Sequence, residues 1–268
     1  MTKLATVGAV LTLTCAPVAA SAEPGEEVVA TTLTAIRSNA EAFKAVWVSF
    51  PIQFSAIGEL HNPFFTRFVS TDYTNFHGWA DDQPIWRKPE YDDVFGLLFM
   101  SKKNPQLSQL VQLRTYQRVK VTGIVRNTFQ GQPWIEVTEM EPLEGQVDTA
   151  TLSHLFRGER HMNERRWKLA ITELSLAPAE GVPAEVRAAV HRNLGVCYLR
   201  LGEASNAANH LYEAIALLEG RYDPEAQRLL LIAETDPQLG LDRAVDRQAV
   251  QDGDRPLWEA FAPAAPPR

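Results

Sequence analysis

The sequence predicts an α+β protein with two modules, a β-rich domain followed by an all-α array of helix-turn-helix repeats. Of the 24 aromatic residues, 17 lie between Phe43 and Glu144. The segment that follows is rich in Ala, Leu, Arg and Glu, and its apolar residues recur at helical spacing. This change in composition predicts a domain boundary near Gly145, with a β-rich domain over residues 43–145 and a helical domain over residues 149–235.

The first 22 residues have the pattern of a secretory signal peptide. Lys3 precedes a short apolar run, and the small residues Ala20, Ser21 and Ala22 end it. The run is shorter than the roughly 20 apolar residues that a transmembrane helix needs, and we find no such segment later in the sequence. We therefore expect cleavage after Ala22 and a periplasmic or extracellular mature chain, in which residues 23–42 form a linker with an N-terminal helix.

Cys15 suggests an alternative, because a cysteine after an apolar run is the anchor of bacterial lipoproteins. Thr12, Leu13 and Thr14 resemble that signal poorly, since small residues are expected beside the cysteine. If the leader is removed, Cys197 is the only thiol left. The sequence then excludes an intramolecular disulfide and predicts that Cys197 is a small buried apolar residue.

Charge and composition narrow the function classes. The chain is 45% hydrophobic and 22% charged, with a formal net charge of -7. An acidic chain of this kind argues against general affinity for nucleic acid or anionic membranes, which requires clustered Lys and Arg.

The β-rich domain shows five strand signals and one helix signal. The expected strands, in chain order, are residues 44–50, 64–69, 94–100, 117–126 and 133–140. Leucines at helical spacing after Pro105 predict a helix over residues 106–113, between the third and fourth strands. Gly131 supplies the turn of the last hairpin.

This order of elements resembles the OB-fold, a small five-stranded β-barrel with a helix between its third and fourth strands. The resemblance covers about one hundred residues and rests on element order alone, so an SH3-like barrel or another small α+β fold stays open. OB-folds bind oligonucleotides, oligosaccharides or proteins. Strand alternation places Arg118, Lys120 and Trp134 on the outer face of the last hairpin, where they could stack on and pair with a single strand. Against this, residues 43–145 hold ten basic and eleven acidic side chains.

Residues 72–93 are the least regular part of the domain and combine aromatic side chains with acidic pairs. Loops often carry function, and acidic pairs can hold a cation. The spacing of an EF-hand, with its Gly and final Glu, is missing here. We therefore expect aromatic packing under a long loop and no metal site.

In the second domain, residues 188–221 carry a regular set of small and large side chains, Leu194, Gly195, Tyr198, Ala207, Leu211 and Ala214. By this spacing the segment resembles the tetratricopeptide repeat, a 34-residue helix-turn-helix unit, and it is the clearest copy. A weaker copy has Gly158, His161, Ala170, Leu174 and Ala177 at the same places. Residues 223–233 resemble a capping helix, and the Pro-rich end of residues 236–268 predicts a partly disordered tail.

The resemblance implies partner-binding residues on the concave side of the repeats. These are Glu159, Met162 and Asn163 in the weaker copy and Arg192, Val196, Leu199 and Arg200 in the better one. The competing interpretation is that they are ordinary surface or packing residues between repeats. Two repeats and a cap form a short array, so we expect it to lean on the β-rich domain or to form a homo-oligomer.

Motifs for catalysis are absent from the sequence. None of the six histidines belongs to a His-Glu-x-x-His pair, and the sequence contains no phosphate-binding Gly-rich loop and no Gly-x-Ser-x-Gly elbow. We therefore expect no enzyme activity, cofactor or metal. The sequence favours an exported adaptor that binds protein partners through its repeats, with the β-rich domain as a second binding or assembly module. The alternative is an OB-fold protein for nucleic acid or oligosaccharide, in which the repeats give only oligomerisation.

Overall fold

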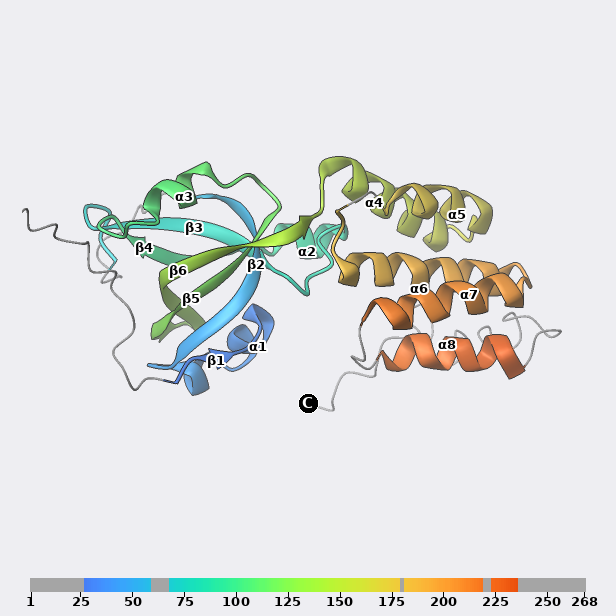
Figure 1. The fold of residues 1–268 in the computed structure, drawn as a ribbon, viewed down its shortest axis with the longest axis horizontal. Coiled ribbons are helices and arrows are strands. Elements are labelled where there is room, and N and C mark those ends of the chain that lie inside the picture. Colours follow the sequence, from blue (N-terminus) through green and yellow to red (C-terminus); the bar gives the residue numbers. More distant parts are fainter. Residues whose placement is uncertain (1–26, 59–67, 179–180, 219–222, 236–268) are drawn as a thin grey trace, which may run out of the picture.

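The computed structural model describes residues 27–58, 68–178, 181–218 and 223–235. A curved β-sheet module and a helical module lie side by side along the long axis of the molecule (Figure 1). The predicted signal peptide, Cys15 and the tail beyond residue 235 lie outside the described residues. The order of a sheet followed by helices agrees with the sequence prediction.

The sheet contains six strands, in the order β1-β2-β3-β4-β6-β5. Their bounds are β1 Val29–Ala30, β2 Trp47–Ile57, β3 Tyr73–Ala80, β4 Phe95–Ser101, β5 Gln117–Phe129 and β6 Gln132–Gln146. The β1–β2 and β4–β6 pairs are parallel, the other pairs are antiparallel, and β2 pairs with β5 as well as with β3. The prediction of a small five-stranded, OB-like barrel is therefore wrong, because one mixed six-stranded sheet forms this module.

Two details account for the difference. The short strand β1 pairs with Val48 and Ser49 and lies in the stretch that was expected to be a linker and a helix. Strand β3 lies in the stretch that was expected to be an irregular loop. Of the strand expected over residues 64–69, only the last two residues are described, and they precede β3 without strand structure.

The sheet encloses its own hydrophobic core. Alternating residues of β2, β4 and β5 point inward, as at Phe50 and Ile52, Leu98 and Met100, and Val119. Three short helical segments belong to this module: α1 Leu33–Ser38, the 3₁₀ turn η1 Ala40–Phe43 and α3 Leu107–Gln112. The buried apolar residues of α1 and α3 belong to the core cluster of the sheet.

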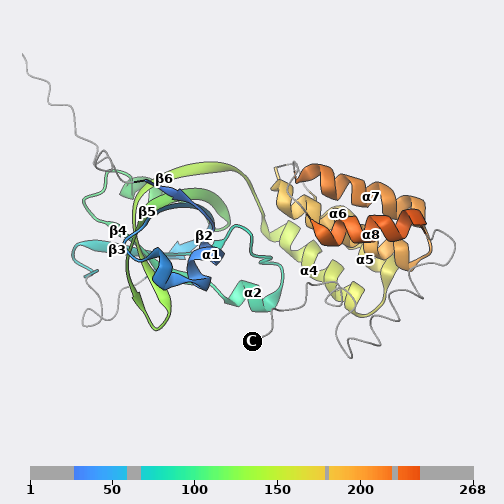
Figure 2. The same ribbon diagram turned by 90° about the horizontal axis from the view of Figure 1, so that it is seen from below.

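Within the described residues, the helical module consists of five helices, α4 Thr149–Asn163, α5 Trp167–Leu176, α6 Ala184–Arg200, α7 Ala204–Leu217 and α8 Pro224–Thr235. They pack as successive antiparallel neighbours (Figure 2). Glycine allows two of these contacts, since a Cβ atom at Gly158 or Gly195 would lie 2.7 Å from the nearest side-chain carbon of Leu174 or Leu211, respectively. None of the described helices is long and apolar enough to cross a membrane.

Candidate functional site at the sheet–helix junction

The connection from β3 to β4, residues 81–94, forms a junction loop that contains the short helix α2 Lys88–Asp92. Gln83 holds this loop in shape: its Oε1 accepts from the Ala80 amide at 3.1 Å, and its Nε2 donates to the Glu90 carbonyl at 2.7 Å. Trp79 Nε1 donates to the Tyr91 carbonyl at 2.9 Å. Buried side chains thus form hydrogen bonds with backbone groups of the loop, which keeps the loop ordered.

The junction loop inserts into the helical module. Ile85 and Trp86 belong to the same apolar cluster as Leu155 of α4 and Leu194 of α6. Trp86 is 9% exposed, although it precedes the second module by more than 60 residues. Because apolar burial of this size is strongly favourable, the junction loop is held in the core of the helical module, while the sheet keeps a separate core.

A single carboxylate connects the junction loop to the helices. Glu159 of α4 accepts from Trp86 Nε1 at 2.8 Å and from Arg87 Nε and Nη2 at 2.9 and 3.1 Å. Asn193 Nδ2 of α6 lies 3.4 Å from the same carboxylate. The Glu159 side chain is only 11% exposed, so these charge-assisted bonds lie largely out of water and fix the direction of approach.

A second connection lies at the end of β6. The Gln146 amide donates to the Gly181 carbonyl, in the connection before α6, at 3.0 Å. Gly145 has a φ of 77°, and a Cβ atom there would lie 3.0 Å from the same Gly181 carbonyl oxygen. The positive φ and the close approach of the Gly181 carbonyl both favour glycine at position 145, where the chain passes from one module to the other.

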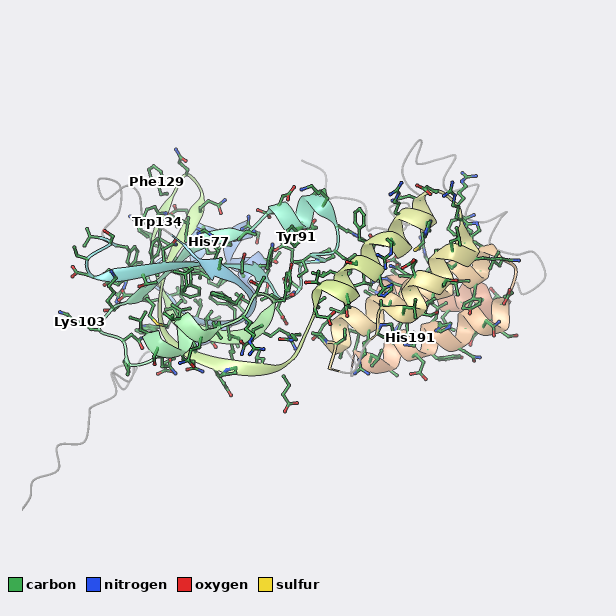
Figure 3. The ribbon with its side chains drawn as sticks, turned by 90° about the horizontal axis from the view of Figure 1, so that it is seen from above. His77, Tyr91, Lys103, Phe129, Trp134 and His191 are labelled. Carbon is green, nitrogen blue, oxygen red and sulfur yellow. The ribbon has the colours of Figure 1, made fainter. Side chains whose placement is uncertain are left out.

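An open groove of about 250 Å³ lies beside the inserted loop and is called here the aromatic groove. Tyr91 and Phe156 contribute its most exposed rings, at 39% and 49%. Figure 3 places Tyr91 where the sheet meets the helices. The groove is lined by Ile85, Trp86, Lys88, Tyr91, Tyr116, Thr149, Leu152, Ser153 and Phe156.

The two tyrosines of the groove form a fixed pair. Their hydroxyls lie 3.0 Å apart, and the Trp79 ring packs against both, with centroid distances of 5.2 Å to Tyr91 and 5.6 Å to Tyr116. Burial, with the hydrogen bond to Tyr91, raises the pKa of Tyr116 to about 12. The Tyr116 hydroxyl is therefore neutral near pH 7, and the pair presents hydrogen-bonding groups beside apolar ring faces.

A second cavity of about 220 Å³ is also lined by Trp86 and is rich in charge. Its carboxylates belong to Asp81, Asp82, Glu159, Glu185 and Asp223, and its guanidinium groups belong to Arg87 and Arg192. Asp81 pairs with Arg118 within the sheet module, Asp223 pairs with Arg192 within the helical module, and the Arg87–Glu159 pair joins the two modules. We interpret this cavity as part of the junction structure.

The predicted partner-binding residues of the helices do not form one exposed surface. Met162, Val196 and Leu199 are at most 3% exposed and belong to the core. Arg200 is 7% exposed, and its guanidinium lies 5.6 Å from the centre of the Trp167 ring. Among the seven, Asn163 alone is exposed.

Glu159 and Arg192 have structural partners instead of solvent. Glu159 faces the junction loop, as described above. Arg192 Nη1 donates to Asp223 Oδ2 at 2.9 Å and lies 3.5 Å from Glu225, so it ties α6 to the start of α8. Glu159 of α4 therefore joins that helix to the junction loop, and Arg192 of α6 joins that helix to the start of α8.

The predicted alternative ligand face is dispersed. Arg118 is in a buried ion pair with Asp81, at 2.5 and 2.7 Å, and Lys120 lies 3.6 Å from Glu141 at the surface. Trp134 lies opposite Asn127, seven residues further along β5 than Lys120, a separation of about 23 Å at the rise of a strand.

Trp134 belongs to a separate aromatic cluster on the sheet. Its ring stacks with Phe99 at 5.5 Å and with Phe68 at 6.2 Å, and Phe129 packs edge-on against it. Figure 3 shows Trp134 and Phe129 at the end of the sheet away from the helices. The three residues Arg118, Lys120 and Trp134 are thus not brought together to bind one strand.

Only a weak signal in the sequence pointed to the groove residues that do come together. Tyr91 and Trp86 lie in the segment that was expected to pack under a loop, and Tyr116 was not singled out. The signal present was the density of aromatic residues within residues 72–93. In the described parts of the chain, no three His, Cys, Asp or Glu side chains gather closely enough to hold a metal ion.

Comparisons of this chain with protein-family models, with curated proteins and with solved structures give no match.

Proposed function

We propose that this chain is an exported, non-enzymatic adaptor, and that its aromatic groove binds an extended apolar segment of a protein partner. The observation that carries the proposal is the pair of exposed rings, Tyr91 and Phe156, which face one groove from two different modules. Exposed aromatic side chains that rim a hollow are the usual anchors of protein recognition.

The size and chemistry of the groove favour a peptide segment. A volume of about 250 Å³ is below the usual range of small-molecule pockets but has room for one or two side chains. Apolar and aromatic side chains dominate the lining, and Lys88 is its one charged residue. Lys88 is neutralised by Asp92 at 2.7 Å. We therefore expect the bound segment to present apolar or proline side chains, with a backbone carbonyl near the tyrosine hydroxyls.

The groove is also held in place before any partner arrives. Its sheet-side wall is held by Trp79 and by Gln83, and its floor by the bonds from Glu159 to Trp86 and Arg87. Prior ordering of this kind lowers the entropy cost of binding.

The second part of the proposal concerns the helices. We propose that α4 to α7 form two repeats of the tetratricopeptide kind, with α8 as a cap. The glycine–leucine contacts between α4 and α5 and between α6 and α7 support this, because they recur at equivalent places in both pairs. Export follows from the signal-like first 22 residues, and N-terminal sequencing of the protein from the native host tests it by the expected start at Glu23.

Site-specific photocrosslinking tests the groove. The photoreactive residue p-benzoylphenylalanine replaces Phe156, where it keeps an aromatic ring, and the protein is irradiated in its native host. The matched control carries the same residue at Val111 of α3, which is 63% exposed and does not line the groove. We expect a protein adduct at position 156 that is absent at position 111.

A second change decides whether the groove itself is responsible. In the Tyr91→Ala background the adduct at position 156 should be lost, while circular dichroism shows an unchanged fold. Identical adducts at both positions, or adducts that survive the loss of Tyr91, would reject the groove as the binding surface.

A further inference from the structure

Two histidines face each other between α6 and α7. The Nδ1 atoms of His191 and His210 lie 3.1 Å apart, with ring centroids 5.2 Å apart and ring planes at 50°. Tyr198 stacks on His210 at 5.2 Å and 8°, which limits the orientation of that ring. Both histidine side chains are half-buried, and Figure 3 shows His191 within the helical module.

The separation of the two nitrogen atoms suits a shared metal ion. Two imidazole nitrogens on one tetrahedral Zn²⁺, each at about 2.0–2.1 Å, lie about 3.3 Å apart, and their ring centres lie about 5.2 Å apart. The observed distances of 3.1 and 5.2 Å differ little from these values. A small rotation of the rings would bring both lone pairs onto one ion.

We propose that His191 and His210 form a binding site for a divalent transition-metal ion of the Zn²⁺ or Cu²⁺ type, which clamps α6 to α7. Imidazole nitrogen is a preferred ligand of both ions. Water would complete the coordination, because among the described residues no third His, Cys, Asp or Glu side chain lies close enough to act as a ligand.

The surrounding charges are compatible with a cation. The negative charge of Glu213 acts on both rings, whereas Arg187 acts on His191 in the opposite sense. One carboxylate and one guanidinium thus act on the pair with opposite signs.

This site is independent of the aromatic groove, because it lies between two helices and needs no partner protein. Without metal, the same two nitrogens can share a hydrogen bond in which one ring donates and the other accepts. A metal ion would replace this bond by two stronger ones and would stabilise the folded chain in proportion to its concentration.

Calorimetric titration of ZnCl₂ into the full chain, prepared without a polyhistidine tag, tests the proposal. We expect one Zn²⁺ per chain, with binding weakened by about tenfold or more in His191→Gln and in His210→Gln. Glutamine keeps a polar side chain of similar size, and thermal melts confirm that both variants fold.

The matched control is His154→Gln, because His154 is also half-buried on a helix but pairs with Glu173 at 2.9 Å and lies beside Arg157. This control should bind Zn²⁺ as the parent does. With Cu²⁺, electron paramagnetic resonance should show coupling to two imidazole nitrogens in the parent and to fewer in either site variant. Absence of binding, binding that survives loss of His191 or His210, or equal loss in the control would overturn the site.

Discussion

Substitution of Glu159 tests whether its carboxylate holds the junction loop on the helical module. Glu159→Ala removes the acceptor of three hydrogen bonds of 3.1 Å or less, from Trp86 and Arg87. Leaving the buried Trp86 Nε1 without an acceptor costs about 1–3 kcal/mol. Arg87 is 38% exposed and regains water, so the loss of its ion pair adds only about 1 kcal/mol. We expect Glu159→Ala to lower the free energy of unfolding by about 2–4 kcal/mol.

Urea denaturation followed by circular dichroism measures this loss, and a second substitution separates its causes. In Glu159→Gln the amide oxygen still accepts from Trp86, so the expected loss falls to about 1–2 kcal/mol. Hydrogen exchange should rise in residues 81–93 of the alanine variant, because the junction loop loses its tether.

The control is Glu173→Ala on α5. Glu173 also accepts from two partners, His154 and Arg157, but lies at the surface of the helical module with 22% of its side chain exposed. We expect a loss of less than about 1 kcal/mol. If Glu159→Ala costs no more than this control, the carboxylate does not hold the modules together and the description of the junction is wrong.

Three further predictions concern the helices. Asp148 caps α4 by accepting from the Thr151 amide, and this hydrogen bond lowers the pKa of the Asp148 carboxyl. Asp148→Ala should lower the stability by about 1 kcal/mol at neutral pH, and thermal melts should show this loss shrinking as the pH falls below about 4. Asp148→Asn keeps a cap that does not depend on pH. Burial raises the pKa of the Cys197 thiol to about 12, so in a Cys15→Ser chain Ellman's reagent should titrate one thiol only after unfolding. Gly195→Ala should destabilise by about 1–3 kcal/mol through its clash with Leu211, and become neutral in a Leu211→Ala background; an equal loss in both backgrounds would contradict the clash.

Helical periodicity in the sequence was informative because it depends on local spacing. The close approach at Gly158 and Gly195 could be read from the spacing of small and large residues, and the structure places leucines against both. Strand β3 escaped the same reasoning. On its core face Gly78 separates Phe76 from Ala80, and the opposite face carries the buried Asn75, which donates to the carbonyls of Gly96 and Leu98, so the strand shows little apolar alternation.

The site depended on long-range pairing that sequence spacing does not encode. Alternation predicted that Arg118, Lys120 and Trp134 share one strand face, but only the register of β5 with β6 shows how far apart Lys120 and Trp134 lie. Glu159 was expected to face a partner from the concave side of a repeat. It faces the junction loop because Trp86 and Arg87, 72–73 residues earlier in the chain, lie on that side of α4 and donate to its carboxylate.

This inward pairing changes which face of the helices is open to a partner. A carboxylate with three donors satisfies a buried polar cluster fully, and such clusters specify one arrangement even where their net contribution to stability is small. The arrangement specified here brings Phe156 of α4 and Tyr91 of the junction loop to one groove. A rotation of the helical module would separate the two rings without unfolding either module. Partner binding should therefore be more sensitive than stability to Glu159→Gln, and crosslinking at position 156 in that variant measures the difference. Equal adduct yield in Glu159→Gln and the parent would show that the groove does not depend on the angle between the modules.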